Sequence, residues 1–281
     1  VHQANMVGLM ELLQNEGILI AHHISQPGKD LLEKKGINYL DIAGNCFIKS
    51  SQGLFWKINN KRAPKIEAVN KHRAFHKNGV KLIFALMIDE ALINQPYRVQ
   101  AEVANISSST VGAIHKDLQK AKFLFQLNKE TKQLGNKQEL LSQWVQAYHQ
   151  KLKPKLFRER YRLLKGGTEN WQKTDLGNFA FWGGEPAADV LTNFLHPEDL
   201  TLYTNLDRRQ LIKQLKLIPD SNGGVEVYSL FWKLENDLMV NTAQKTVHPL
   251  LVYADLLGTG DNRNYETAMK IYERYLKDIF E

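Results

Sequence analysis

The sequence has few of the features that mark secreted, membrane or disulfide-bonded proteins. Its 281 residues contain a single cysteine, Cys46, which excludes an internal disulfide. The longest apolar run, Leu82 to Ile88, is far too short to span a bilayer. No charged-then-apolar signal segment opens the chain. We therefore expect a cytoplasmic protein without membrane contact.

Sequence motifs of several large enzyme classes are also missing. The chain has no Walker motif, no G-x-S-x-G elbow and no H-E-x-x-H pair. His22-His23 and His72/His76 have no partner cluster at metal-ligand spacing, so exposed or capping roles are expected for them. We predict no cofactor, no metal and no enzymatic activity. The chain begins at Val1 in a helical pattern, as expected of a processed chain or of a fragment without an upstream element.

What the sequence does have is an ordinary globular composition with an uneven distribution of charge. Hydrophobic residues make up 43% and charged residues 24%, and the length leaves room for two or three domains. Residues 1–165 hold 26 Lys and Arg against 13 Asp and Glu, a net charge of +13. Residues 166–281 hold 11 against 17, a net charge of −6. The basic part is suited to a polyanionic partner.

Basic residues concentrate in two clusters, at 57–81 and at 151–165. Such clusters are usually solvated surfaces, and each alone is weak support for a function. The two lie on either side of a segment with the pattern of a DNA-binding unit. In that position they would suit phosphate contacts, which orient a duplex without reading its sequence.

The segment between the clusters, residues 77–135, has the pattern of a winged helix–turn–helix. Apolar residues recur at helical spacing in three stretches. Pro96 opens the second at a first-turn position, and a serine of the run 107–109 is placed to cap the third by accepting a backbone N–H. The strand-like run 123–127 and the basic turn 128–132 then resemble a wing.

The third helix would bury Val111, Ile114 and Leu118 and leave small, polar and basic residues outside. Such a helix is suited to entering a major groove with its N-terminus first. Three packed helices in some other small bundle are the plainer alternative, but the combination with a basic wing favours DNA binding. The predicted DNA-binding residues are Arg98, Ser108, Ser109, Thr110, Ala113, Lys116, Lys120, Lys129 and Lys132.

We expect an α+β fold with several domains. A small α/β unit, 1–62, should have a helix before Gly17, a helix at 27–35 and strands at 18–21, 37–42, 46–48 and 54–58. A basic linker, 63–76, leads to the winged helix, 77–135, and then to an amphipathic helix and basic segment, 136–165. The acidic C-terminal α+β domain, 166–281, should have helices at 185–194, 207–215 and 248–257, strands at 200–204, 225–228 and 231–234, and a last helix capped by Asp261 or Asn262.

Asp41 is the first candidate for chemistry. A strand-borne aspartate followed by Lys49 on the next strand is faintly similar to restriction-endonuclease cores, in which carboxylates hold Mg²⁺. The acidic partner would have to stand at Phe47, so that metal site is incomplete. We favour a turn in which Gly44 and Asn45 adopt positive φ and Asp41 bonds the turn backbone.

Gly183-Gly184 is the second candidate, because nucleotidyltransferases carry a glycine pair before a helix. Those enzymes also need two carboxylates on the following strand to bind metal ions. Here that strand reads LTLYT, at 200–204, and carries none. The pair is therefore compatible with a degenerate nucleotidyltransferase-like domain, and nucleotidyl transfer is not expected.

Several segments together resemble the AbiEi-type antitoxins of type IV toxin–antitoxin systems, in the branch of transcriptional regulators. They are NYLDIAGNCFI (38–48), QPYRVQAEVANISSSTVGAIHKDL (95–118), LLSQWVQAYHQKLKPKL (140–156), WGGEPAADVLTNFLHPEDLTLYT (182–204) and HPLLVYADLLGTGDNRNYETAMKIYERYL (248–276). The resemblance implies a bacterial protein whose winged helix binds operator DNA and represses its own operon. It also implies antitoxin activity of the C-terminal region against a nucleotidyltransferase-like toxin, without a stable complex being required. Unlike the better-known members, this chain has an α/β unit before the winged helix.

The prediction is therefore a DNA-binding transcriptional regulator, and paired half-sites would make it a homodimer on double-stranded DNA. A metal-dependent nuclease that uses the N-terminal unit, with the winged helix as its targeting module, is the alternative. A third possibility is a protein whose winged helix packs on another protein instead of DNA.

Overall fold

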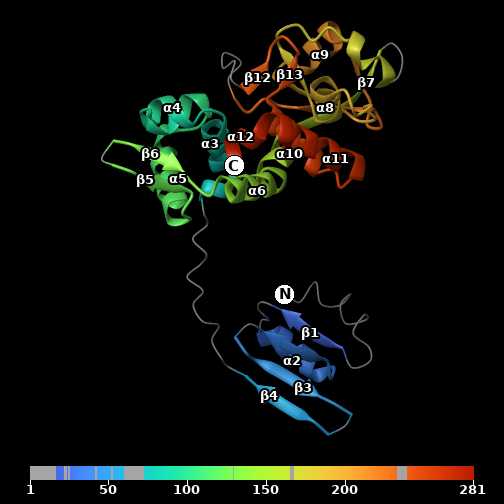
Figure 1. Ribbon diagram of the computed structural model, residues 1–281. Helices are drawn as coiled ribbons and strands as arrows, with labels where there is room; N and C mark the ends of the chain where they lie inside the picture. Colours follow the sequence, from blue (N-terminus) through green and yellow to red (C-terminus); the bar gives the residue numbers. More distant parts are fainter. Residues whose placement is uncertain are drawn as a thin grey trace. The chain divides into compact units, whose positions relative to one another are not determined.

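The chain divides between Lys71 and His72 into two compact units. Figure 1 shows the computed structural model with both units coloured along the sequence. The residues that the structure describes are 17–21, 24, 26–41, 43–51, 53–59, 73–128, 130–164, 168–232 and 239–281. Among these residues, no helix combines the length and the apolar character needed to cross a membrane.

The first unit is a four-stranded sheet with one helix. Its strands are β1 (Ile18–Ala21), β2 (Asn38–Asp41), β3 (Cys46–Lys49) and β4 (Phe55–Ile58), in that spatial order. Helix α2 (Gln26–Lys34) makes the crossover that allows β1 to run parallel to β2. The other two strand pairs are antiparallel.

The described elements of this unit lie within about two residues of their predicted positions, because short apolar strands bounded by turn residues are a clear signal. Leu32 of α2 packs with Tyr39 and Phe47 of the sheet in a small core. The helix expected before Gly17 lies outside the described residues.

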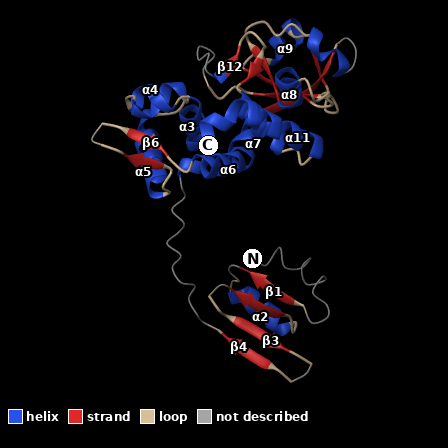
Figure 2. Ribbon diagram, in the orientation of Figure 1, coloured by secondary structure: helices blue, strands red, loops and turns tan. Residues whose placement is uncertain are grey.

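The second unit begins with helices and a hairpin (Figure 2). A short 3-10 helix, η2 (Arg73–Phe75), leads into α3 (Lys77–Ile88), which is followed by the 3-10 helix η3 (Glu90–Asn94), α4 (Tyr97–Val103) and α5 (Ser108–Lys120). The antiparallel strands β5 (Leu124–Gln126) and β6 (Lys132–Leu134) close this part. Pro96 is the N-cap of α4, one residue before the helical position that the sequence suggested.

A long helical segment then connects this part to a large sheet. It consists of α6 (Lys137–Ala147), the π-helical turn η4 (Tyr148–Leu152) and α7 (Lys153–Leu156), and it runs directly into β7 (Phe157–Leu163). The sequence indicated the helix but not the strand. In β7 the residues Tyr161 and Leu163 are buried and Arg162 between them is exposed, so a period of two is hidden in a run that reads as merely basic.

The sheet of the C-terminal part has seven strands in the order β10-β7-β11-β9-β8-β13-β12. Its central strand β9 (Leu200–Thr204) is parallel to β11 (Val225–Tyr228) and antiparallel to β8 (Ala180–Gly183). The shorter strands are β10 (Leu217–Pro219), β12 (Val240–Asn241) and β13 (Thr246–Val247). The mixture of parallel and antiparallel strand pairs is consistent with the α+β class that we predicted.

Helices η5 (Thr168–Lys173), α8 (Gly184–Thr192), α9 (Arg208–Gln214) and α10 (Pro249–Leu257) contact strands of the sheet. The following segments, α11 (Asn262–Ile271), the π-helical turn η7 (Tyr272–Leu276) and α12 (Lys277–Phe280), pack mainly on other helices (Figure 1). The Asp261 side chain caps α11 by accepting from the N–H of Asn264, as the sequence suggested.

One predicted strand, at 231–234, is wrong in its described half. Phe231 and Trp232 are buried but form no strand. Their rings pack against Phe84 of α3, so their hydrophobicity reflects contact with the helical part and not a place in the sheet. One hydrophobic core therefore runs from Ala74 to Phe280 through the whole second unit.

Candidate nucleic-acid interface

Helix α5 has one buried and one exposed stripe. Val111, Ile114 and Leu118 are fully buried at spacings of three and four residues. The opposite side carries the residues predicted from the sequence to contact DNA. Of these, Ser108, Ser109, Lys116 and Lys120 are exposed, and Thr110 and Ala113 are partly exposed. Six of the nine predicted residues thus lie on α5 with exposed or partly exposed side chains.

The N-terminus of α5 is organised differently from the expectation of a serine cap. Ser107 is the N-cap residue, but its side chain accepts no backbone hydrogen bond. Its Oγ instead lies 2.8 Å from Ser109 Oγ, and Thr110 Oγ1 donates to the Ser107 carbonyl at 2.7 Å. These two hydrogen bonds fix the positions of the three hydroxyl groups at the N-terminus of α5.

A buried polar pair fixes α4 against α5. Gln100 and His115 are almost fully buried, and His115 Nε2 lies 2.7 Å from Gln100 Oε1. The Gln100 amide donates to the carbonyls of Gln95 and Ile93, which leaves its Oε1 as the acceptor. His115 Nε2 must then be the donor and its Nδ1 the unprotonated nitrogen.

The pKa of His115 is lowered to about 4, first by burial and then by the neighbouring charge of Lys132. The ammonium of Lys132 lies 3.5 Å from His115 Nδ1, the nitrogen that would take up the proton. The imidazole is therefore neutral near pH 7. We did not single out Gln100 or His115 from the sequence, and two polar residues on otherwise apolar helix faces were the available signal.

The hairpin is joined to the helices through Lys132 and Asn94. The Asn94 side chain accepts from the backbone N–H of Lys132 and donates to its carbonyl, which fixes β6 on η3. Lys132 Nζ lies over the Tyr97 ring, 5.3 Å from its centroid, so this predicted phosphate-contacting lysine is half-buried, at the end of β6 next to the hairpin turn. Arg98 is exposed on α4, and Lys129 lies outside the described residues.

Tyr97 also sets how closely α4 approaches α5. A Cβ at Gly112 would lie 3.2 Å from the Tyr97 ring, so the ring would have to shift by a few tenths of an ångström to accept it. The Tyr97 ring meets the His115 ring edge to face, with centroids 5.0 Å apart. Glycine at position 112 therefore permits the helix contact on which the position of α5 depends.

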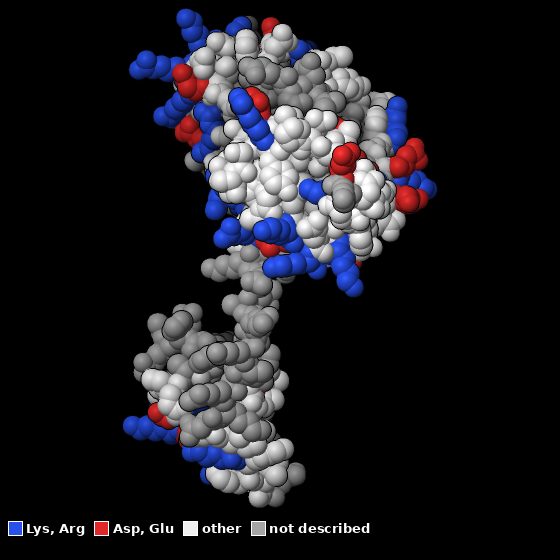
Figure 3. Space-filling view, turned by 90° about the vertical axis from the view of Figure 1, so that its left-hand side faces the viewer, with Lys and Arg blue, Asp and Glu red and all other residues white. Residues whose placement is uncertain are grey.

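Figure 3 shows the side of the molecule on which α4, α5 and the hairpin lie in Figure 1. Lys and Arg side chains gather at the margins of this side of the second unit, around an uncharged centre. The part of the first basic cluster between Lys61 and Lys71 lies outside the described residues.

The second basic cluster is largely paired within the C-terminal part. Arg158 donates to the carbonyl of Leu206 at 2.6 Å, Arg160 pairs with Glu226, and Arg162 lies 3.6 Å from Asp220. These arginines therefore stabilise β7 against its neighbours. Because these arginines are paired within the C-terminal part, α5 and the hairpin are the basic surface that we consider for contact with nucleic acid.

Asp41 is held by its own unit. Its carboxylate pairs with Lys29 of α2 at 2.9 Å and accepts from the backbone and side chain of Asn45. Hydrogen bonds from Lys29 and Asn45 lower the pKa of this buried carboxyl, although burial alone, the largest single influence, raises it. Gly44 has the positive φ expected of the turn, and Asn45 does not.

The contacts of Asp41 leave Lys49 without a part in this cluster, and Lys49 is exposed. Within the described residues, no three His, Cys, Asp or Glu side chains converge as metal ligands would. His76 is the N-cap of α3 and forms no side-chain cap bond, and His22, His23 and His72 lie outside the described residues.

Gly183-Gly184 lies beside a buried polar network. The Asp255 carboxylate accepts from the hydroxyls of Tyr148 and Tyr203 and pairs with Lys153 at 2.8 Å. It also accepts from the N–H of Gly184, at 3.3 Å. A Cβ at Gly183 would lie 2.4 Å from the Tyr203 ring, so packing explains the first glycine.

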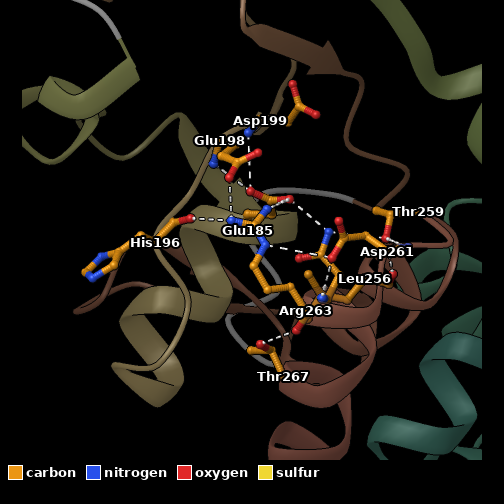
Figure 4. Close-up of polar contacts among 10 residues, drawn as sticks. Glu185, His196, Glu198, Asp199, Leu256, Thr259, Asp261, Arg263 and Thr267 are labelled. Atoms are coloured by element: carbon orange, nitrogen blue, oxygen red, sulfur yellow. Dashed lines mark hydrogen bonds and ion pairs between the residues drawn. The ribbon is translucent and has the colours of Figure 1, made fainter.

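Gly184 has a φ of +46°, a backbone conformation that residues other than glycine rarely adopt. Backbone geometry thus explains the second glycine. Beside the pair lies a polar cavity of about 500 Å³, part of whose wall is drawn in Figure 4. In the sequence, only the glycine pair indicates this place.

Residues 133–277, just over half of the chain, match a family model described as "Transcriptional regulator, AbiEi antitoxin, Type IV TA system". The matched region begins in β6 and covers the connecting helix and nearly all of the C-terminal part. No curated protein and no solved structure matches the chain.

Proposed function

Because this chain belongs to the AbiEi antitoxin family of transcriptional regulators of type IV toxin–antitoxin systems, we propose that residues 77–135 are a winged helix–turn–helix that binds double-stranded DNA. The observation that carries the proposal is the exposed stripe of α5, which has small and hydroxyl side chains at its start and lysines further along. A helix of this composition suits the major groove, where its first residues reach base edges.

The proposed contacts follow from position on the unit. Ser108, Ser109, Thr110, Ala113 and Lys116 would face base edges or nearby phosphates. The remaining residues, Arg98, Lys120, Lys129 and Lys132, would contact the DNA backbone, which contributes affinity but not sequence preference. The fixed α4–α5 packing through Gln100 and His115 supports this assignment, because base readout requires a recognition helix held at a defined angle.

The biological role follows from family membership. We propose a cytoplasmic regulator that binds the promoter of its own operon, represses it, and counteracts a nucleotidyltransferase-like toxin encoded beside it. A homodimer on paired half-sites would supply the affinity that one helix lacks. The C-terminal part would carry the antitoxin activity, and its glycine pair before α8 is compatible with a degenerate nucleotidyltransferase-like fold.

The experiment is a titration of promoter DNA, and of unrelated DNA of equal length, at several salt concentrations. We expect tighter binding to the promoter. The double variant Lys116→Ala/Lys120→Ala should weaken binding to both sequences and reduce the slope of log affinity against log salt by about 0.9 for each lost phosphate contact.

Lys213→Ala is the matched control, because Lys213 is an equally exposed lysine on α9 of the C-terminal part. It should leave both affinity and slope unchanged. Binding without salt dependence, or equal loss in the control, would refute the proposed interface. A complete lack of DNA affinity would instead point to a winged helix that packs on protein.

A further inference from the structure

The cavity beside Gly183-Gly184 has an excess of negative charge. Six carboxylates line it, from Glu185, Glu198, Asp199, Glu226, Asp255 and Asp261. Lys153 is committed to Asp255 and Arg160 to Glu226. Of the four carboxylates that remain, three lie within ion-pair distance of Arg263.

Arg263 is shared among three of them, as Figure 4 shows. Its guanidinium lies 2.7 Å from Glu198, 3.7 Å from Glu185 and 3.8 Å from Asp261. Asp199 has no such partner in the described part of the chain. Burial is the largest influence that raises the pKa of Asp199, and the nearby charges of Glu185 and Glu226 raise it further.

A second feature of the wall independently indicates a missing donor. Asn264 lines the cavity and is 1% exposed, and its amide nitrogen donates to Glu185 and Thr259. Its carbonyl oxygen, Oδ1, accepts no hydrogen bond from the described residues. Buried acceptors nearly always have a partner, so this atom calls for a donor that the described residues do not supply.

Phosphate ligands do not fit this cavity. The N-terminus of α8 would be the natural place for a phosphate, since free N–H groups and the helix dipole favour an anion there. Asp255 already accepts from the Gly184 N–H, and Glu185 lies in the first turn of the helix. The protein's own carboxylates occupy the anion position and would repel a nucleotide.

From the unbalanced carboxylates and the unsatisfied Asn264 oxygen, we infer that this cavity binds a small organic cation through ammonium or guanidinium N–H groups. The volume of about 500 Å³ lies within the range of small-molecule sites and far exceeds that of a bare metal ion. Such a ligand would donate to Asn264 Oδ1 and neutralise Asp199. It would also contact the π-helical turn that carries His149 and continues α6.

The test is calorimetric titration of the full chain at constant ionic strength with putrescine and with agmatine. The first offers two ammonium groups and the second an ammonium and a guanidinium. The neutral 1,4-butanediol has the length of putrescine without its charge, and ATP tests the anionic alternative. We expect saturable binding of at least one of the two cations, and none of the diol or of ATP.

Asp199→Asn removes the unbalanced charge from an exposed side chain and should weaken cation binding by about tenfold or more. An unchanged melting temperature will show that this variant is folded. Asp175→Asn is the matched control on the surface outside the cavity, and it should bind as the parent does. No saturable binding of either cation, equal binding by Asp199→Asn, or binding of ATP would each overturn the inference.

Discussion

The buried pair Gln100 and His115 determines several features of the contact between α4 and α5. Their single mutual hydrogen bond fixes the tautomer of the imidazole, connects α4 to α5 and places the open nitrogen beside Lys132. Two buried polar groups without partners would be costly, and here each satisfies the other. The arrangement also makes the unit sensitive to acid, because protonation of His115 would place two cations side by side.

The acid sensitivity can be measured directly. The pKa of His115 in the folded protein, about 4, lies below its usual value of about 6.5, so the unfolded chain binds the proton more readily. The free energy of unfolding should therefore fall as the pH drops from about 6.5 to 4, by up to about 1.4 kcal/mol per pH unit for this group. His248, whose pKa is likewise lowered to about 4 by burial, should add to the fall.

Urea unfolding at a series of pH values checks this expectation. His115→Gln keeps an N–H donor for Gln100 but cannot be protonated, and it should reduce the pH dependence by one proton. His196→Gln replaces an exposed histidine and serves as the control. The same pH dependence in His115→Gln as in the parent would contradict the role given to this imidazole.

Helix α6 is the element on which the second unit depends most. Trp144 is fully buried, and its ring N–H donates to the Val80 carbonyl of α3 at 2.9 Å. The indole stacks on Phe84 on one side and on Tyr148 on the other, each 5.5 Å away between centroids. Through η4 and α7 the same helical segment enters the seven-stranded sheet. The proposed DNA-binding part is thus packed against the C-terminal part and is not joined to it by a linker alone.

Trp144→Ala should accordingly destabilise both parts together. Loss of a buried tryptophan costs about 3–5 kcal/mol, and because the core is continuous the loss should appear equally in α5 and in β9. Native-state hydrogen exchange measures the stability of α5 and of β9 separately. Ser142→Ala, at an exposed position of α6, is the control. Faster exchange in α5 with unchanged exchange in β9 would show that the two parts fold independently.

At the scale of the whole molecule, local patterns were readable from the sequence and long-range ones were not. Helices α3, α4 and α5 and the hairpin lie where apolar periodicity and turn residues predicted them. Strand β7 was missed because alternation in Phe157–Leu163 is masked by arginines whose partners come from distant segments. The pairing of Asp41 with Lys29 and the gathering of carboxylates around Asn264 likewise depend on the tertiary fold.

The division of the second unit into a winged helix, 77–135, a connecting segment, 136–165, and a C-terminal domain, 166–281, stays a prediction. The structure divides the chain into two compact units between Lys71 and His72, and it does not divide the second unit further. Of the proposed DNA-binding residues, α5 contributes six, and their common exposure follows from helical spacing alone. Nothing in one sequence could have indicated that Lys132 also lies over the Tyr97 ring.

The most direct test of DNA contact by α5 is cleavage of bound DNA from a chosen residue. The single cysteine, Cys46, is buried, and in a Cys46→Ser background a cleavage reagent such as iron-EDTA can be attached at one introduced cysteine. From Ser109→Cys, at the exposed start of α5, we predict cuts at defined positions of the promoter, in two symmetric patches if the protein binds as a dimer. From Lys213→Cys, on α9, we predict none. Cleavage from Lys213→Cys but not from Ser109→Cys would contradict the proposal that α5 reads DNA.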